Sequence, residues 1–217
     1  MGSLADKLKH FKSTFDANTP TELLETINRS ISLLQQQCIG DRCVQLEHKF
    51  PEFQLPNAKG QLVSSETLLN EHPLVITFIR GGWCPYCMLE IQAWQQYYEA
   101  SFQHFNIIAI TPEIAEYALA TKQDNAMRFP LLIDQNLQLA SALGLVHTLD
   151  ADMKDVLLKW DIDLHKRTCD ERYSLPIPAT FVIDQNRTVK YMYVEEDYTQ
   201  RAEPEEVLKI YQKLDKN

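Results

Sequence analysis

The sequence predicts an α/β fold in which strands alternate with helices and the sheet ends in an antiparallel hairpin. Short apolar runs rich in β-branched residues, typical of buried strands, alternate with segments whose apolar residues recur every three or four positions, typical of helices. Near the C-terminus two such runs are joined by a short polar turn, which indicates a hairpin. The 217 residues contain no internal repeat and no long linker, so one main domain with a short extension accounts for them.

The N-terminal segment is predicted to form two helices in front of the main domain. Leu4, Leu8, Phe11 and Phe15 share one helix face, and Pro20 ends that segment. A second amphipathic pattern follows, formed by Leu23, Leu24, Ile27, Ile31, Leu34 and Cys38. Because two helices bury little surface against each other, we expect both faces to pack on the main domain or on a partner chain. These faces motivate a homodimer as a hypothesis, and we divide the chain into an extension (1–44) and a main domain (45–217).

The main domain is predicted to contain alternating elements followed by a hairpin and a final helix. A small hairpin surrounds the turn at 56–60, and residues 74–79, 106–110 and 131–133 have the length and composition of buried strands. The other expected elements are the strands 180–183 and 189–194 and helices near 88–98, 113–125, 137–143, 151–160 and 203–211. This alternation favours parallel strands with helical layers, to which the hairpin adds an antiparallel edge.

Charge and targeting features narrow the classes of function. Lys and Arg number 21 against 30 Asp and Glu, which gives a formal net charge of −9 and no general attraction to nucleic acid or to an anionic membrane. The N-terminus lacks the apolar stretch of a secretory signal, and no apolar run in the sequence is long enough to span a bilayer. We therefore expect a cytoplasmic protein. In that reducing compartment, paired cysteines favour redox or metal chemistry over structural disulfides.

Cys84 and Cys87 form a Cys-Pro-Tyr-Cys motif between the end of a strand and the start of a helix. Pro85 disfavours a helical conformation at Cys84 and suits the first helical turn, so we expect Cys84 exposed at the N-cap edge, beside the positive helix end. That position favours the thiolate, the nucleophilic form of the thiol. Cys87 lies one turn further on, within disulfide reach, and can resolve an intermediate formed at Cys84. Arg80 would favour the thiolate further if its side chain turns inward.

The remaining cysteines leave alternatives open. A Cys-x-x-Cys pair is also half of a zinc site, and Cys38, Cys43 and His48 are spaced like ligands, although they lie on another segment without a matching second pair. We interpret Cys38 as a helix core residue, with a local disulfide to Cys43 as the less favoured alternative. We interpret Cys169 as an exposed loop thiol, with a resolving role as its alternative. No histidine is assigned a role.

Two further segments accompany the dithiol. Pro178 stands just before a predicted strand, where an X-Pro bond can be cis, although Pro176 and Pro178 would equally stiffen a loop. The acidic stretches 195–197 and 203–206 are interpreted as solvated surface and as the start of the last helix.

Three segments together resemble the peroxiredoxin-like branch of the alkyl hydroperoxide reductase/thiol-specific antioxidant (AhpC/TSA) family. They are Arg80-Gly-Gly-Trp-Cys-Pro-Tyr-Cys87, Leu175-Pro-Ile-Pro-Ala-Thr-Phe-Val-Ile-Asp184 and Asp197-Tyr-Thr-Gln-Arg-Ala-Glu-Pro-Glu-Glu-Val-Leu208. The resemblance runs from about residue 45 to the C-terminus. It implies a thioredoxin-like fold, with a central mixed sheet flanked by helices, and an antioxidant oxidoreductase without metal or nucleotide cofactor. It also implies a cis Pro178 facing the dithiol, and an Ile177 backbone offered to an extended substrate or to glutathione.

The sequence departs from this family at the groups that polarise a peroxide. Members carry Pro-x3-Thr-x2-Cys up to the peroxidatic cysteine. Aligning that cysteine with Cys87 puts Arg80 and Cys84 in place of Pro and Thr, and aligning it with Cys84 puts Thr77 and Gly81 there. Peroxide reduction needs donors aimed at the peroxide oxygens. Arg80 is therefore the candidate substitute.

The arginine that usually precedes the later strand is replaced as well, by Pro178. We therefore interpret the chain as a thiol–disulfide oxidoreductase, in which Cys84 attacks and Cys87 resolves, reduced by thioredoxin or glutathione. The residues expected to shape the site are Arg80, Trp83, Pro85, Tyr86, Ile177 and Pro178. Two alternatives remain open: a thiol peroxidase acting on hydrogen peroxide or organic hydroperoxides, and a redox-inert or zinc-holding adaptor.

Overall fold

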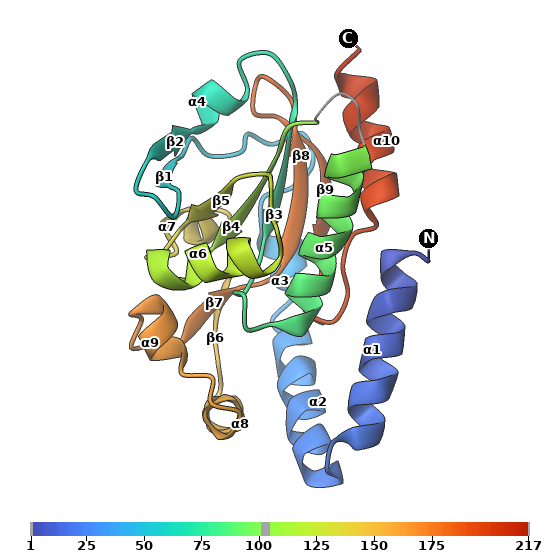
Figure 1. The fold of residues 1–217 in the computed structure, drawn as a ribbon, viewed down its shortest axis with the longest axis vertical. Helices are drawn as coiled ribbons and strands as arrows, with labels where there is room; N and C mark the ends of the chain where they lie inside the picture. The colour runs from blue at the N-terminus through green and yellow to red at the C-terminus, as the bar shows by residue number, and fades with distance from the viewer. Residues whose placement is uncertain (1, 101–104, 217) are drawn as a thin grey trace.

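A five-stranded mixed sheet forms the centre of the computed structural model, which describes residues 2–100 and 105–216 (Figure 1). Its strand order is β5-β4-β3-β8-β9. The three parallel strands are β3 (Leu74–Phe78), β4 (Ile107–Thr111) and β5 (Leu131–Ile133). The antiparallel edge consists of β8 (Ala179–Ile183) and β9 (Val189–Val194). The predicted α/β class, with parallel strands and a closing hairpin, is confirmed.

The central strand β3 is buried over its whole length, which explains why it reads as a continuous apolar run rather than an alternating one. Its successive side chains point to opposite faces of the sheet. Val75 belongs to one hydrophobic cluster, which includes Trp94 of α5, and Ile76 belongs to another, which includes Phe50 and Phe181. Both faces of the sheet are therefore covered.

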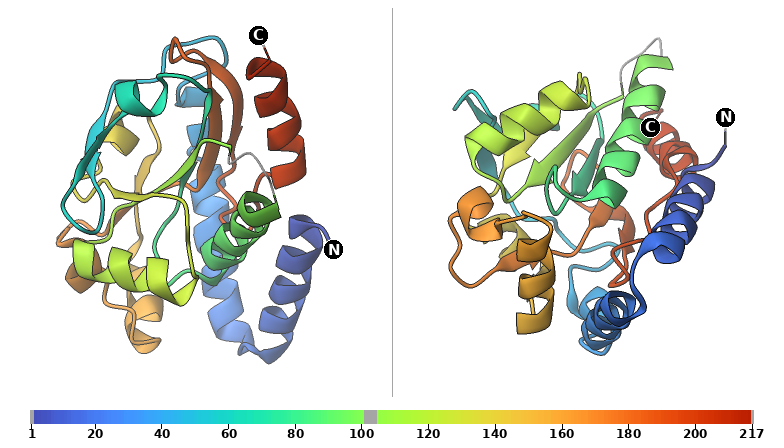
Figure 2. Two further views of the ribbon diagram at one scale, coloured as in Figure 1. Left: turned by 45° about the horizontal axis from the view of Figure 1, so that its top comes forward. Right: turned by 60° about the horizontal axis from the view of Figure 1, so that its bottom comes forward.

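Helices connect and cover the strands, as Figures 1 and 2 show. The helix that follows β3 is α5 (Pro85–Ala100), β4 is followed by α6 (Ala115–Asp124), and β5 by α7 (Gln138–Ala142). The chain ends in α10 (Pro204–Leu214), which contacts α5, β8 and β9. None of the described helices is both long and apolar enough to cross a bilayer.

The N-terminal segment forms the two predicted helices, α1 (Leu4–Asn18) and α2 (Thr21–Gln35). Helix α1 packs on α5, and α2 packs on α8 (Ala151–Lys159). In Figure 1 they form a helical hairpin that projects below the sheet. The expectation that their apolar faces pack on the main domain is confirmed, because both faces are used within this chain.

Several short elements were not predicted. They are α3 (Ile39–Arg42), α4 (Ser65–Leu68), α9 (Leu164–Thr168) and the antiparallel pair β6 (Val146–Thr148) and β7 (Ser174–Pro176). The predicted small hairpin is present as β1 (Gln54–Pro56) and β2 (Leu62–Ser64). The elements that were not predicted have three to five residues each, which is too short to show a period, whereas the small hairpin was indicated by its turn.

Candidate active site

The loop between β3 and α5 places the Cys-Pro-Tyr-Cys motif at the end of the central strand. Cys84 immediately precedes α5, which begins at Pro85, as the motif predicts. Gly81 has φ +144°, and a Cβ there would lie 2.6 Å from Nε1 of Trp83, so only glycine fits. The Cys84 amide donates to the Gly81 carbonyl (3.2 Å), which closes the turn in front of the helix.

A buried carboxylate fixes this loop from the side of α6. Glu113 accepts a hydrogen bond from the Gly82 amide (2.8 Å) and pairs with Nη1 of Arg167 (2.7 Å). Its side chain is fully buried, so the contact with Arg167 offsets the cost of burying the charge. In the sequence Glu113 indicates only the start of a helix, and its role in holding the loop was not predicted.

Both thiols of the motif are buried, which corrects the expectation that Cys84 is exposed. Cys84 is 1% exposed and Cys87 is inaccessible. The cause is tertiary, since α1, α8 and Tyr198 lie over the helix start that the sequence alone presents to solvent. Cys84 nevertheless lines a cavity, whereas Cys87 does not.

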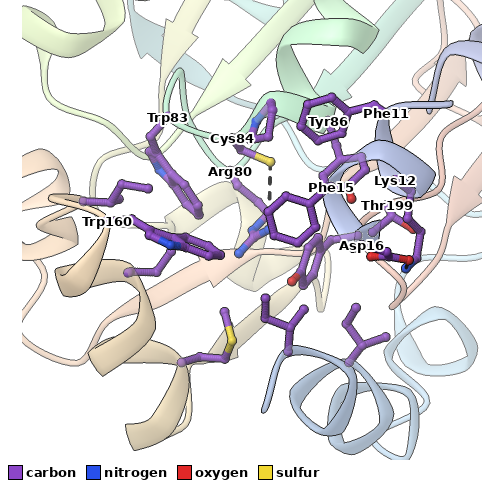
Figure 3. A pocket seen from close by; sticks show the side chains of 17 residues that line it. Phe11, Lys12, Phe15, Asp16, Arg80, Trp83, Cys84, Tyr86, Trp160 and Thr199 are labelled. Atoms are coloured by element: carbon purple, nitrogen blue, oxygen red, sulfur yellow. Dashed lines mark hydrogen bonds and ion pairs between the residues drawn. The ribbon is translucent and has the colours of Figure 1, made fainter. Parts of the chain in front are cut away.

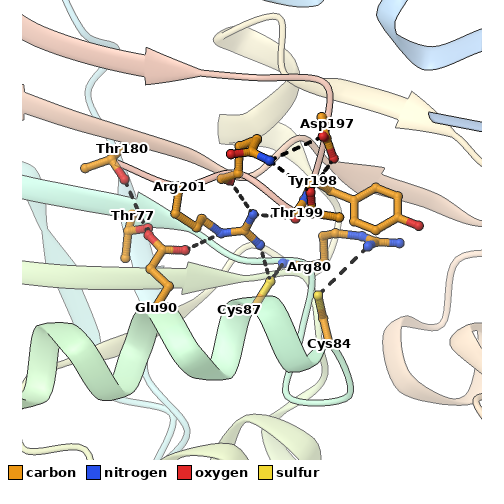
Figure 4. A network of polar contacts seen from close by, with 11 residues as sticks. Thr77, Arg80, Cys84, Cys87, Glu90, Thr180, Asp197, Tyr198, Thr199 and Arg201 are labelled. Carbon is orange, nitrogen blue, oxygen red and sulfur yellow. Dashed lines mark hydrogen bonds and ion pairs between the residues drawn. The ribbon is translucent and has the colours of Figure 1, made fainter. Parts of the chain in front are cut away.

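Arg80 turns toward the sulfur of Cys84, as anticipated. Its Nη1 lies 3.9 Å from Cys84 Sγ, and its guanidinium lies between the rings of Trp83 (4.7 Å to the centroid) and Tyr198 (4.0 Å), as Figures 3 and 4 show. Cation–π contacts of this kind hold a desolvated guanidinium in place. Arg80 is itself buried, so its charge acts on the sulfur with little screening by water.

The two thiols have opposite pKa shifts. Burial acts to raise the pKa of Cys84, but the hydrogen bond from Cys87 and the charges of Arg80 and Arg201 outweigh burial and lower that pKa to about 5. Burial and the neighbouring Cys84 thiolate raise the pKa of Cys87 well above its ordinary value, against the charge of Arg201. At neutral pH the pair therefore carries one proton, held by Cys87.

Arg201 is the second cation of the site, and it contacts Cys87 (Figure 4). Its Nη2 lies 3.1 Å from Cys87 Sγ, and its Nε donates to Glu90 (2.6 Å). Glu90 also accepts from the Thr77 hydroxyl (2.6 Å). Burial acts to raise the pKa of the Glu90 carboxyl, and the charge of Arg201 opposes this. The network is fully buried, so it fixes the position of the guanidinium beside the deeper thiol.

Arg201 was not predicted as a site residue, because it stands between two acidic stretches that are typical of surface. It lies inside the third segment that carries the family resemblance, 197–208, which was the available signal. The segment between β9 and α10 brings Arg201 back to α5, where the side chain is 2% exposed.

A cavity of about 260 Å³ opens beside Cys84 (Figure 3). Arg80, Trp83 and Tyr86 line its inner end together with the thiol. Most of the remaining lining consists of aromatic and aliphatic side chains. A reactant can therefore reach Cys84 in an apolar space beside a fixed cation.

The prolyl segment differs from its expected form. The resemblance implies a cis Pro178, but the structure has no cis peptide bond between described residues, so this expectation is wrong. Strands β3 and β8 are antiparallel, and their last pair is Phe78 with Ala179. Pro178 precedes Ala179 and therefore lies at the end of the sheet where the Arg80 loop begins. The Ile177 amide donates to the Leu145 carbonyl (2.8 Å), so it is used within the protein rather than free for a substrate.

The other cysteines lie away from this arrangement. Cys38 is exposed with φ 47°, so its interpretation as a core residue is wrong, whereas the interpretation of Cys169 as an exposed thiol is confirmed. Cys43 is buried, which raises its pKa to about 11.

Within residues 2–100 and 105–216 no group of three His, Cys, Asp or Glu side chains could hold a metal ion. The neighbours of the dithiol are cations rather than metal ligands, which argues against a zinc site there.

Comparison with known families decides the assignment. The model of the AhpC/TSA family matches residues 46–192, which is most of the chain. The chain belongs to the AhpC/TSA family. Members of this family are thiol-dependent oxidoreductases of the peroxiredoxin type, and this AhpC/TSA protein is an enzyme of that class. Helices α1 and α2, Arg201 and α10 all lie outside the matched segment.

Solved structures of peroxiredoxins share the fold. Peroxidoxin BcpB from Mycobacterium tuberculosis gives a TM-score of 0.60 at 18% identity, over 79% of this chain and 98% of that one. A peroxiredoxin-like protein from Aquifex aeolicus gives 0.62 at 13%, over 79% and 88%. AhpC from Enterococcus faecalis gives 0.57 at 16%, over 77% and 91%. These likenesses confirm the expected thioredoxin-like architecture. A comparison with curated proteins found no match.

Proposed function

We propose that this AhpC/TSA protein is a dithiol peroxidase in which Cys84 attacks the peroxide and Cys87 resolves the product. The observation that carries this proposal is the asymmetry of the pair. Cys84 has the lowered pKa, the adjacent Arg80 and the cavity, whereas Cys87 has the raised pKa and no access to the cavity. A nucleophile has to be both ionised and reachable, and only Cys84 is both.

The proposed reaction has two steps. The Cys84 thiolate attacks one peroxide oxygen, an S–O bond forms as the O–O bond breaks, and the leaving oxygen takes a proton to become water or an alcohol. The Cys87 sulfur then attacks the resulting sulfenic acid, which forms the Cys84–Cys87 disulfide and releases water. One peroxide thus oxidises two thiols to one disulfide. An external thiol returns the pair to the reduced state.

Arg80 is proposed to supply the donor that the family pattern lacks in this sequence. Its Nε is buried and donates to no group of residues 2–100 and 105–216, although its Nη1 lies near the Cys84 sulfur. An unpaired buried donor is costly, and a peroxide oxygen beside Cys84 would pair it. Trp83 positions the guanidinium, and Pro85 and Tyr86 form the helix start that holds the thiol.

Burial of the thiol favours a small oxidant over a protein disulfide. Cys84 is 1% exposed and faces a cavity of about 260 Å³, and the Ile177 amide, the expected anchor for an extended chain, is already paired. A peroxide fits this space and a folded polypeptide does not. Reduction of protein disulfides, the activity favoured by the motif alone, is therefore our second candidate, and a zinc-holding adaptor the least favoured.

The test is peroxide consumption with a thiol donor by the wild type and by Cys84→Ser, Cys87→Ser and, as matched control, Cys169→Ser. We expect Cys84→Ser to lose consumption and Cys169→Ser to keep it. We expect Cys87→Ser to accumulate a sulfenic acid at Cys84 that dimedone traps. Oxidation of Cys84 by peroxide at the rate of free cysteine, together with rapid reduction of a protein disulfide, would establish the second candidate instead.

The partners and the organisation of the chain form the last part of this proposal. Thioredoxin or glutathione is the proposed electron donor, since the disulfide needs an external thiol, and a reducing compartment such as the cytoplasm would supply both. We retain residues 1–44 as an extension of a main domain at 45–217. The homodimer remains a prediction, and its original motive has weakened because the apolar faces of α1 and α2 pack within the chain. Native mass spectrometry would show 25.2 kDa for a monomer.

A further inference from the structure

We infer that the N-terminal helix pair, α1 and α2, forms the substrate-selecting wall of the active-site cavity. The inference rests on the proposed peroxidase function, because it assigns specificity to the same site. Both helices precede the segment that the family model matches, whereas α8, which also lines the cavity, lies within that segment. The inference predicts a preference for compact apolar hydroperoxides with a body about the size of one ring.

Three helices contribute apolar side chains to the lining of the cavity. Two of these side chains come from α1, two from α2 and two from α8, and Figure 3 labels the two from α1. In that order they are Phe11, Phe15, Ile27, Ile31, Met153 and Leu157. Every one of them is apolar, so this part of the cavity offers contact area and no hydrogen bond.

Ring contacts and polar contacts hold the wall in place. Phe11 packs edge to face on Tyr86, which stands between Pro85 and Cys87 in the motif (5.1 Å between ring centroids). Phe15 meets Trp160 at the end of α8 in the same way (5.9 Å), which bridges α1 and α8 across the cavity. The Ser30 hydroxyl of α2 donates to Asp150, the N-cap of α8 (2.6 Å). The cavity thus has a fixed shape, which is the condition for selecting among substrates.

Two buried N–H donors on residues that line the cavity have no partner among the described residues, namely Nε of Arg80 and Nε1 of Trp83. Lys12 and Asp16 also line it, but they pair with each other (2.7 Å). Arg80 is the cation that faces the thiol, and its Nε lacks a partner within the part of the chain that the structure describes. A ligand that suits both ends has one apolar body and one oxygen acceptor placed at the sulfur, as in a hydroperoxide.

The volume of the cavity limits the apolar body. An engineered apolar cavity of about 150 Å³ holds benzene. The present space of about 260 Å³ therefore accepts a ring with a short branched substituent that carries the hydroperoxyl group. A long acyl chain exceeds this volume. Phe15 and the partly exposed Trp160, whose rings are in contact, restrict where such a chain could leave the cavity. Cumene hydroperoxide is accordingly a suitable probe, and a fatty acid hydroperoxide is the contrasting one.

The test compares oxidation of Cys84 by cumene hydroperoxide and by hydrogen peroxide in variants of the wall. Ile27→Phe fills the cavity, so we expect its rate constant for cumene hydroperoxide to fall at least tenfold and that for hydrogen peroxide to change less than threefold. Phe15→Ala opens the contact with Trp160, so we expect it to raise the rate for a fatty acid hydroperoxide relative to cumene hydroperoxide. Leu33→Ala is the matched control, because Leu33 is an exposed residue of α2 outside the cavity.

Binding of an unreactive analogue separates this inference from the proposed function. Cumyl alcohol carries the same ring and an acceptor oxygen but cannot oxidise a thiol. We expect it to bind the wild type and Leu33→Ala alike, and Ile27→Phe at least tenfold more weakly. If cumyl alcohol binds in this way but peroxide oxidises Cys84 no faster than free cysteine, the proposed peroxidase function is refuted and the inference about the cavity wall stands. Equal binding of the alcohol by Ile27→Phe and Leu33→Ala, or an unchanged ratio of the two peroxide rates, would refute the wall.

Discussion

Cys84 and Cys87 stand three residues apart, yet their sulfur atoms have different surroundings. Arg80 approaches the first sulfur through the cavity, and Arg201 approaches the second from inside the protein. Each cation is held by its own partners, namely two aromatic rings for Arg80 and a buried carboxylate for Arg201. The two thiols thus differ in the arginine that each one contacts, and the hydrogen bond from Cys87 adds to the effect of the arginines on the pKa of Cys84.

The first prediction concerns Arg80 and the pH dependence of Cys84. With a pKa of about 5, Cys84 is almost fully ionised above pH 6, so its alkylation rate should be flat from pH 6 to 8 and fall below pH 5. Arg80→Gln removes a charge that lowers this pKa, so we expect the midpoint to rise by about one unit or more. Mass spectrometry of iodoacetamide labelling at Cys84 gives the profile.

Arg172→Gln is the control for this measurement, because Arg172 is a largely exposed side chain that pairs with Asp170 away from the dithiol. The control should keep the wild-type profile. An Arg80→Gln profile with its midpoint still near pH 5 would show that the hydrogen bond from Cys87 suffices to ionise Cys84.

The second prediction concerns Arg201 and the resolving step. Arg201→Lys keeps the positive charge but loses the geometry that joins Cys87 Sγ to Glu90. We expect oxidation of Cys84 to proceed within about threefold of the wild type. Disulfide formation from the sulfenic acid should slow about tenfold or more, since the Cys87 thiolate loses a donor worth about 1.5–3 kcal/mol. Rapid quenching and mass spectrometry distinguish the two steps.

A titration of Cys87 checks the same prediction without peroxide. In the Cys84→Ser background, thiolate absorbance should show a higher Cys87 pKa when Arg201 is replaced by Lys. Identical titrations with and without that change would mean that Arg201 serves the fold and not the thiol.

At this scale the sequence predicted the motif and missed its surroundings. The spacing and Pro85 located the dithiol at a helix start, and the side chain of Arg80 turns inward as expected. The burial of Cys84, the contact of Arg201 with Cys87 and the paired Ile177 amide all depend on segments far away in the chain. No local pattern reports such contacts, which is why the prediction of an exposed Cys84 was wrong. The cis Pro178 was carried over from the family resemblance, and this chain does not share it.

At the scale of elements, α1 depends on a side chain from the other end of the chain. Ser3 caps the helix by accepting from the Asp6 amide, and Glu203 accepts from the amides of Leu4 and Ala5. Glu203 immediately precedes α10, so one residue joins the first helix to the last. Glu203 belongs to an acidic stretch that was interpreted as surface and as the start of the last helix, and no local pattern indicates its second contact.

The third prediction is that Glu203→Gln loosens α1. A carboxylate at a helix N-terminus contributes about 0.3–1 kcal/mol through its charge, and the neutral amide loses that part. We expect faster hydrogen exchange of the amides in the first turns of α1, and slower oxidation by cumene hydroperoxide if α1 forms the cavity wall. Glu205→Gln is the control, because its exposed side chain pairs with Lys209 instead. Equal exchange of α1 in both variants would contradict the prediction.

The long elements were predictable because their apolar residues repeat over several turns or fill a whole strand. Helices α1, α2 and α8 and strands β3, β4 and β9 all show such patterns. The pair β6 and β7 is different, since its strands have three residues each and lie about 25 positions apart. Their pairing is a property of the folded chain, and it puts His147 inside the protein.

At the scale of the whole molecule, the alternation of patterns predicted parallel strands with an antiparallel hairpin, whereas the strand order and the site depend on contacts between distant segments. The β3–α5 loop supplies the thiols, the segment after β9 supplies Arg201, and α1, α2 and α8 close the cavity. The family model covers residues 46–192 and thus the loop and α8, while α1, α2 and Arg201 lie outside it. Both ends of the chain are therefore needed to complete the site.

The last prediction concerns the stability of the molecule below neutral pH and depends on His147. Burial lowers the pKa of this histidine from 6.5 to about 3, with a further contribution from the charge of Arg80. The folded state thus keeps His147 neutral while the unfolded state takes up a proton below pH 6.5, so this group lowers stability as the pH falls from 6.5 toward 3. Between pH 7 and pH 5 its share of the loss is about 2 kcal/mol in the free energy of unfolding. Replacing the side chain by one that cannot titrate, His147→Gln, should remove that share, while His10→Gln, which changes an exposed histidine of α1, should leave it in place. Urea unfolding of the reduced protein at the two pH values measures the difference, and equal losses in the wild type and His147→Gln would show that His147 does not stay neutral in the folded protein.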